Sequence, residues 1–303
     1  LVRHVDVHAI VRKGVVVAAH KGLLTLEVVS SVVVGQDLVK KSQIRKTLAQ
    51  IDSYYVAINS FYQKYRAIPG DMDNATAFWG SHAKCPFKSP KKASTVVTCN
   101  GNNNKILTES ALNNRTGEIF LFWQHLANSN LIPGEYTGRS GRNNRFDSMI
   151  NINIPATAIP AGGISIQPYG INNIKGDLTV FPKSSRHYFV VGQDAPGIDD
   201  GNAPHDWKYY PYTGFPLISS LEALDIDKKL DDGMPGLGKI HTRRGKKNWK
   251  QWDEYTCTND IPTFVSGSEE ATLQSQSAAK TAKYDVGLKG TQCYLLFEIN
   301  FPI

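Results

Sequence analysis

Residues 44–71 read IRKTLAQIDSYYVAINSFYQKYRAIPGD. Apolar side chains recur in this segment at alternating intervals of four and three, which is the period of one face of an α-helix. We call this set the helix seam; its members are Ile44, Leu48, Ile51, Tyr55, Ile58, Tyr62 and Tyr65. The Pro-Gly pair at 69–70 cannot continue a helix. The pattern therefore predicts a helix from Asp37 to Tyr65, about 43 Å long at about 1.5 Å per residue.

A second informative segment lies upstream of this helix. Lys21 and Gly22 precede an apolar stretch that contains one acidic residue, Glu27, five positions after the glycine. A carboxylate within an apolar segment is costly in a membrane and usually marks a function. The apolar stretch ends at Gln36, short of the roughly 20 residues that a membrane-spanning helix needs.

The end of the predicted helix extends into the run AINSFYQKYRAIPGDMDNATAFWG at 57–80. With the segment around Gly22, this run resembles the type IV pilin and type II secretion pseudopilin family, whose members carry a prepilin-type cleavage and methylation motif. The resemblance implies that Gly22 precedes the cleaved bond and that Leu23, usually Phe in the family, becomes the new N-terminus. It also implies that Glu27, at the fifth mature position, pairs with the terminal amine of a neighbouring subunit.

The resemblance continues later in the chain, in patches. Residues 123–136 are similar to the same proteins, and so is the segment IDKKLDDGMPGLGKI at 226–240. The resemblance implies three parts: a basic leader at 1–22, a membrane and spine helix at 23–66, and a globular pilin-like body at 67–303. The expected fold class is α+β, with the long N-terminal helix packed on an antiparallel β-sheet and with long decorated loops.

Other elements of the body follow from local patterns. A second amphipathic helix is predicted from near Thr116 to Asn128, and its His125 has no partner motif, so we interpret it as a packing or surface histidine. Ser219 and Glu222 form a capping box that predicts the start of a short helix. Alternating apolar residues predict strands at the following positions: Ile152, Ile154, Ile164, Ile166, Leu178, Val180, 188–191 and 293–301.

The four cysteines fall into two pairs that are local in sequence, Cys85 with Cys99 and Cys257 with Cys293. None of the spacings is CxxC, which disfavours a zinc ribbon or a thioredoxin-like redox pair. An even count in clustered pairs suits two disulfides in an oxidising compartment. The alternative is four unrelated buried thiols in a cytosolic protein.

Charge clusters suggest two further sites. The acidic residues Asp199, Asp200, Asp231 and Asp232 are weak Ca²⁺ candidates without EF-hand spacing, and solvated turns are the alternative. The residues Arg243, Arg244, Lys246, Lys247, Trp249 and Lys250 interleave basic and aromatic side chains, which could hold single-stranded nucleic acid. The alternative there is a solvated loop with partly packed tryptophans. The formal charge of +7 adds little, because four basic residues and one acidic residue fall within the leader.

No Walker, G-x-S-x-G, H-E-x-x-H or G-x-G-x-x-G motif is present, so we do not expect an enzyme and expect no cofactor beyond the Ca²⁺ candidates. The expected function is a structural subunit, major or minor, of a type IV pilus or a type II secretion-like filament. The alternative is a secreted or surface-displayed binding protein, such as an adhesin or a DNA-binding minor pilin. The implied partners are other pilin subunits, a prepilin peptidase and the inner membrane of a bacterium, with the body in the periplasm or in an extracellular filament.

Overall fold

The computed structural model describes residues 7–81, 98–108, 117–139, 148–167, 186–194, 212–244, 257–259 and 280–302. Side chains are described from Gly35 onward in the first helix and as far as Thr242 in the third strand. The chain divides into two compact units, Leu1–Ala49 and Gln50–Ile303. The first helix contributes to both units, and the four strands all belong to the second.

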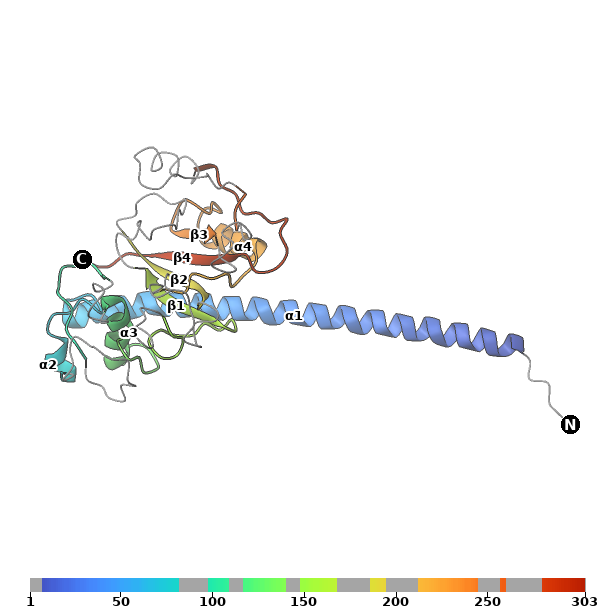
Figure 1. The fold of residues 1–303 in the computed structure, drawn as a ribbon, viewed down its shortest axis with the longest axis horizontal. Helices are drawn as coiled ribbons and strands as arrows, with labels where there is room; N and C mark the ends of the chain where they lie inside the picture. The colour runs from blue at the N-terminus through green and yellow to red at the C-terminus, as the bar shows by residue number, and fades with distance from the viewer. Residues whose placement is uncertain are drawn as a thin grey trace, which may run out of the picture. The chain divides into compact units, whose positions relative to one another are not determined.

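Helix α1 runs without interruption from Val7 to Tyr65 (Figure 1). Its C-terminal end lies where the Pro-Gly turn predicted it. The chain leaves the helix through Arg66, which has a φ of 53°, and Gly70, which has a φ of 87°. A bulky substituent could not replace the hydrogen of Gly70, because an added Cβ would lie 2.3 Å from the carbonyl oxygen of Glu118.

The described residues contain one four-stranded sheet, in which every neighbouring pair is antiparallel. Its spatial order is β1-β2-β4-β3 (Figure 1). The strands are β1 Gly162–Gln167, β2 His187–Gln193, β3 Ile240–Arg244 and β4 Cys293–Ile299. The α+β class, with an N-terminal helix and an antiparallel sheet, is therefore confirmed.

Aromatic side chains join the last turns of α1 to one face of this sheet. The rings of Tyr54 and Tyr55 lie 6.0 Å and 5.4 Å from the ring of Phe189 on β2. The hydroxyl of Tyr55 donates a hydrogen bond of 2.8 Å to the carbonyl oxygen of Glu298 on β4. Trp123, on helix α3 Glu118–Asn128, also contacts Phe189, so α1 and α3 cover the same face of β2.

The helix seam is only partly the buried face of α1. Ile51 and Ile58 are buried, whereas Tyr55, Tyr62 and Tyr65 are half-buried at its border. Other residues of α1 are buried although they do not belong to the seam, namely Thr47, Tyr54, Ala57 and Phe61. The buried stripe is wider than a strict 4-3 pattern because it faces both a sheet and a second helix.

A short helix, α2 Ala75–Trp79, follows the turn. The Trp79 ring packs back on the base of α1, with centroids 6.3 Å from Phe61 and 5.4 Å from Tyr65. His125 on α3 also contacts this group and is fully buried, in agreement with its interpretation as a packing histidine. Phe78 remains 56% exposed at the edge of the aromatic cluster.

The strand predictions were right at 164, 166, 188–191 and in the segment that became β4. They were wrong at Ile152 and Ile154, where the chain turns back on itself through hydrogen bonds to the Met149 carbonyl. Strand β3 was not predicted, because its last two residues, Arg243 and Arg244, were assigned to the basic cluster that follows. Leu178 and Val180 lie outside the described residues.

Helix α4 Ser220–Leu230 begins at the predicted capping box. The Ser219 hydroxyl oxygen accepts from the Glu222 amide, and Glu222 Oε2 accepts from the Ser219 amide at 2.8 Å. Gly233 follows the helix with a φ of 75°, a left-handed conformation that glycine adopts readily after a helix end. The helix contacts strands β3 and β4.

Candidate functional site

The predicted processing residues Gly22 and Leu23 and the predicted assembly residue Glu27 lie within helix α1. Their side chains are outside the part that the structure describes. Farther along α1, Leu38 and Val39 are exposed apolar residues. In the described part of the chain, no helix is both long enough and apolar enough to span a bilayer.

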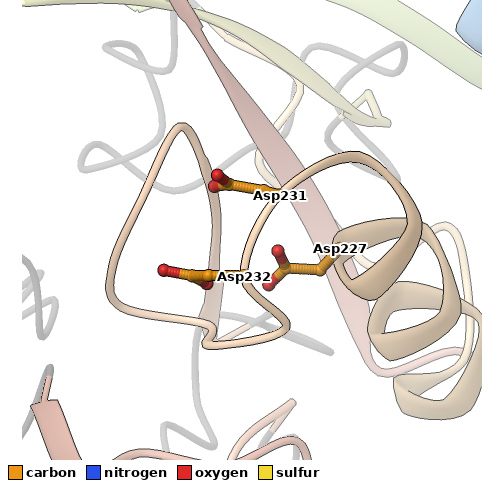
Figure 2. Close-up of side chains that lie close together, drawn as sticks. All are labelled: Asp227, Asp231 and Asp232. Atoms are coloured by element: carbon orange, nitrogen blue, oxygen red, sulfur yellow. The ribbon is translucent and has the colours of Figure 1, made fainter.

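Three carboxylates gather at the C-terminal end of α4 (Figure 2). Asp227 projects from the helix, and Asp231 and Asp232 come from the turn that follows it. Their carboxylate oxygens all lie within 4.8 Å of one another. Oxygen ligands of this kind suit a hard divalent cation such as Ca²⁺, so among the described residues this is the group that could hold a metal.

Each of these carboxylates already accepts hydrogen bonds from the protein. Asp227 accepts from the Tyr284 hydroxyl at 2.7 Å and from the Gly233 amide at 3.1 Å. Asp231 accepts from the amides of Lys239 and Ile240, and Asp232 accepts from the Met234 amide. The cluster therefore closes the 231–240 loop onto the end of α4, which agrees with the interpretation of Asp231 and Asp232 as turn residues.

Burial makes Asp227 chemically different from its neighbours. Its side chain is fully buried, and this desolvation raises the pKa of Asp227 to about 6. The hydrogen bond from Tyr284 opposes the shift, and the charges of Asp232 and Asp231 add to it. The same burial and the Asp227 charge raise the pKa of Tyr284, which keeps that hydroxyl protonated as a donor.

Sequence reasoning missed Asp227 as a site residue. The available signal was its spacing from Asp231, because side chains four residues apart lie on the same face of a helix. Of the other acidic candidates, Asp199 and Asp200 lie outside the described residues. The structure thus brings Asp231 and Asp232 together with a partner that was not predicted.

The disulfide between Cys257 and Cys293 is present, with a Cα–Cα distance of 5.0 Å, and this prediction is confirmed. Both cysteines are fully buried, and Cys293 is the first residue of β4. Cys99 is disulfide-bonded as well. Cys85 lies outside the described residues, so the pairing of Cys85 with Cys99 stays a prediction.

The basic cluster is described only at its first two positions. Arg243 and Arg244 end β3, which lies at the edge of the sheet formed by the described strands. The residues outside the described ranges are Lys246, Lys247, Trp249 and Lys250. A nucleic-acid contact at this cluster therefore remains a hypothesis based on sequence.

Comparison of the chain with protein-family models, with curated proteins and with solved structures found no match.

Proposed function

We propose that the chain is a structural subunit, pilin or pseudopilin, of a type IV pilus or type II secretion-like envelope filament. The observation that carries the proposal is helix α1, which is continuous from the Gly22–Glu27 segment to the α+β body. A subunit that bundles its helices in a filament core and displays its body outside needs this connection.

The contacts of α1 with the body support the same proposal. Tyr54 and Tyr55 pack on β2, and the Tyr55 hydroxyl binds the backbone of β4. The last turns of the helix are thereby fixed to the sheet by both apolar and polar contacts. These contacts would transmit a tensile force from the helix to the sheet, which a subunit of a filament under tension needs.

Glu27 supplies the proposed chemistry of assembly. In an apolar filament core an unpaired carboxylate would be costly, whereas pairing with the amine of a neighbouring subunit offsets that cost. Before assembly, the same helix would hold the subunit in the inner membrane, where a prepilin peptidase would cleave after Gly22. The disulfides suit the oxidising periplasm.

Processing gives the direct test. The chain should be produced in bacteria with and without a prepilin peptidase, and the N-terminus of the envelope fraction should be sequenced. We expect Leu23 as the first residue only when the peptidase is present. The same unprocessed N-terminus in both cultures would contradict the proposal.

The position of β3 favours a second candidate, a surface-displayed subunit that binds nucleic acid. Arg243 and Arg244 end an edge strand, and the four basic and aromatic residues named above follow in sequence. Such a site would bind single-stranded DNA through phosphate charge and base stacking, with strong salt dependence. Fluorescence anisotropy with labelled oligonucleotides tests it: the Arg243→Ala/Arg244→Ala variant should bind more weakly with a shallower salt slope. Equal binding by this variant and the wild type would remove Arg243 and Arg244 from the candidate.

A further inference from the structure

Two segments that follow α1 are held by buried titratable side chains. The segments are the turn at 68–72 and the loop at 101–108, and we call them together the exit loops. Backbone hydrogen bonds join them to each other, from Gly101 to the Met72 carbonyl and from Asn103 to the Asp71 carbonyl, each 2.8 Å long. The buried side chains that accept hydrogen bonds from their amides are Asp71, Glu118, His125 and His187.

Each histidine accepts one of these amide hydrogens. His125 Nδ1 accepts from the Gly70 amide at 2.9 Å, while its Nε2 lies 3.2 Å from the Cys99 carbonyl oxygen and donates to it. His187 Nε2 accepts from the Leu107 amide at 2.9 Å. A ring nitrogen accepts a hydrogen bond only while it is unprotonated. Both bonds therefore require a neutral imidazole.

The two carboxylates bind the same loop. Asp71 accepts from the amides of Asn104 at 3.1 Å and Lys105 at 2.8 Å. Glu118 Oε1 accepts from the Asn102 amide at 3.2 Å, and its Oε2 accepts from the amide and hydroxyl of Thr108 at 2.9 Å and 2.8 Å. A carboxylic acid keeps a carbonyl oxygen as an acceptor after protonation, so these bonds weaken less than those to imidazole.

We propose that the exit loops form an acid-sensitive latch, in which protonation of His125 and His187 breaks their bonds to Gly70 and Leu107 and so loosens the loops at these two points of attachment to α3 and β2. The step is a proton uptake at His125 Nδ1 and His187 Nε2, the two atoms that accept the amide hydrogens. It changes no covalent bond of the backbone and reverses when the proton leaves.

The surroundings of the histidines favour the neutral form at neutral pH. Burial lowers the pKa of His125 and of His187 to about 4. The rings of Phe61 and Trp79 face His125, and the ring of Phe301 faces His187. The charged residues of the adjoining elements are Lys64, Arg66, Asp71, Asp73, Lys105, Glu118, Arg186 and Glu298. Arg186 pairs with Glu298 on the neighbouring strand.

The sign of the pH effect follows from these shifts. A histidine whose folded pKa lies below its ordinary value of 6.5 stabilises the closed latch above pH 6.5, and this contribution is lost as the pH falls toward 4. Burial raises the pKa of Asp71 and of Glu118, so their protonation favours the closed state and opposes the histidines. Protonation removes the accepting nitrogen of each histidine, whereas Asp71 and Glu118 each keep one accepting oxygen, so the bonds to Gly70 and Leu107 are the ones that break.

Amide hydrogen exchange of the whole protein, corrected for the intrinsic rate at each pH, tests the latch. We expect the protection of the Leu107 amide to fall by roughly 100-fold between about pH 6.5 and pH 4. In His187→Gln, an amide oxygen replaces Nε2 as a non-titrating acceptor, and this protection should stay nearly constant. The control is His241→Gln on β3, which should behave like the wild type. An equal loss of protection in His187→Gln, or no loss in the wild type, would overturn the proposal.

A second measurement avoids substitutions altogether. In wild-type protein, NMR titration of the imidazole signals should place the pKa values of His125 and His187 near 4, together with the loss of protection at Gly70 and Leu107. Titration of either ring near its ordinary value of about 6.5 while its amide partner stays protected would show that the latch does not depend on that histidine.

Discussion

Asp227 is buried at the end of α4, whereas Asp225 on the same helix is exposed. Its oxygens meet one hydroxyl and one amide, and among the described residues no cationic side chain pairs with it. Since its folded pKa is raised, its contribution to stability is present at low pH and is lost as the pH rises through about 6.

Asp227→Asn should remove this pH dependence. The amide keeps an oxygen for Gly233 and a partner for Tyr284, but it cannot ionise. Relative to the wild type, the free energy of unfolding of the variant should increase by about 2 kcal/mol between about pH 4.5 and pH 7.5. Urea denaturation at both pH values, with a chelator present, measures this difference. If the two proteins differ in free energy of unfolding by the same amount at both pH values, the buried-carboxylate account is wrong.

Gly70 gives a second test at the scale of one residue. Its φ of 87° disfavours any side chain, and a Cβ at this position would lie 2.3 Å from the Glu118 carbonyl oxygen. Gly70→Ala should therefore destabilise the protein by about 2–4 kcal/mol, measured by chemical denaturation. Gly290→Ala is the control, because Gly290 has the same φ but open space around it. An equal loss in both variants would mean that backbone strain alone, and not the contact with α3, explains the effect.

At the scale of elements, the sequence predicted what local patterns determine. The end of α1 at Tyr65 and the N-cap of α4 at Ser219 depend on neighbouring residues, Pro69-Gly70 and Glu222, and both were predicted. The partners of each face depend on residues far away in the chain. The burial of Tyr54 and Phe61 and the existence of β3 were missed for this reason, because they require β2 and β4 to be in place.

The packing of α1 on the sheet is tested by charge insertion. Ile51 is 2% exposed, and Ile51→Asp would bury an unpaired carboxylate against the sheet side of the helix. We expect a loss of about 3–5 kcal/mol, seen as a large drop in thermal stability. The control Val56→Asp changes a residue that is 64% exposed on the same helix, and it should melt like the wild type. Normal melting of Ile51→Asp would show that this face of α1 is not packed.

At the scale of the whole molecule, the disulfide between Cys257 and Cys293 ties β4 to a distant part of the chain, 36 residues away in sequence. In the chain-entropy description, closing a loop of that length stabilises the folded state by about 4 kcal/mol. The pairing was predictable from cysteine spacing alone. The cluster of Asp227 with Asp231 and Asp232 was not fully predictable, because burial of Asp227 depends on Tyr284 from another segment.

Peptide mapping under non-reducing conditions tests the covalent framework. We expect two linked peptide pairs, Cys85 with Cys99 and Cys257 with Cys293. Cys257→Ser/Cys293→Ser should lower the free energy of unfolding by about 4 kcal/mol, whereas a reductant should have little further effect on β4 in that variant. A linked peptide that joins Cys85 to Cys257 would contradict the local pairing.

The central proposal is that the chain assembles into a filament through Glu27 on α1. The most direct measurement is the amount of chain in filaments sheared from cells that carry the assembly machinery, compared among wild type, Glu27→Ala and Asp37→Ala. Asp37 lies on the same helix and is exposed, so its variant controls for loss of an acidic residue from α1. We predict that Asp37→Ala enters filaments like the wild type and that Glu27→Ala is reduced at least about tenfold, because loss of a charge pair in an apolar core costs more than about 1.4 kcal/mol. Incorporation of Glu27→Ala at the wild-type level would contradict the account.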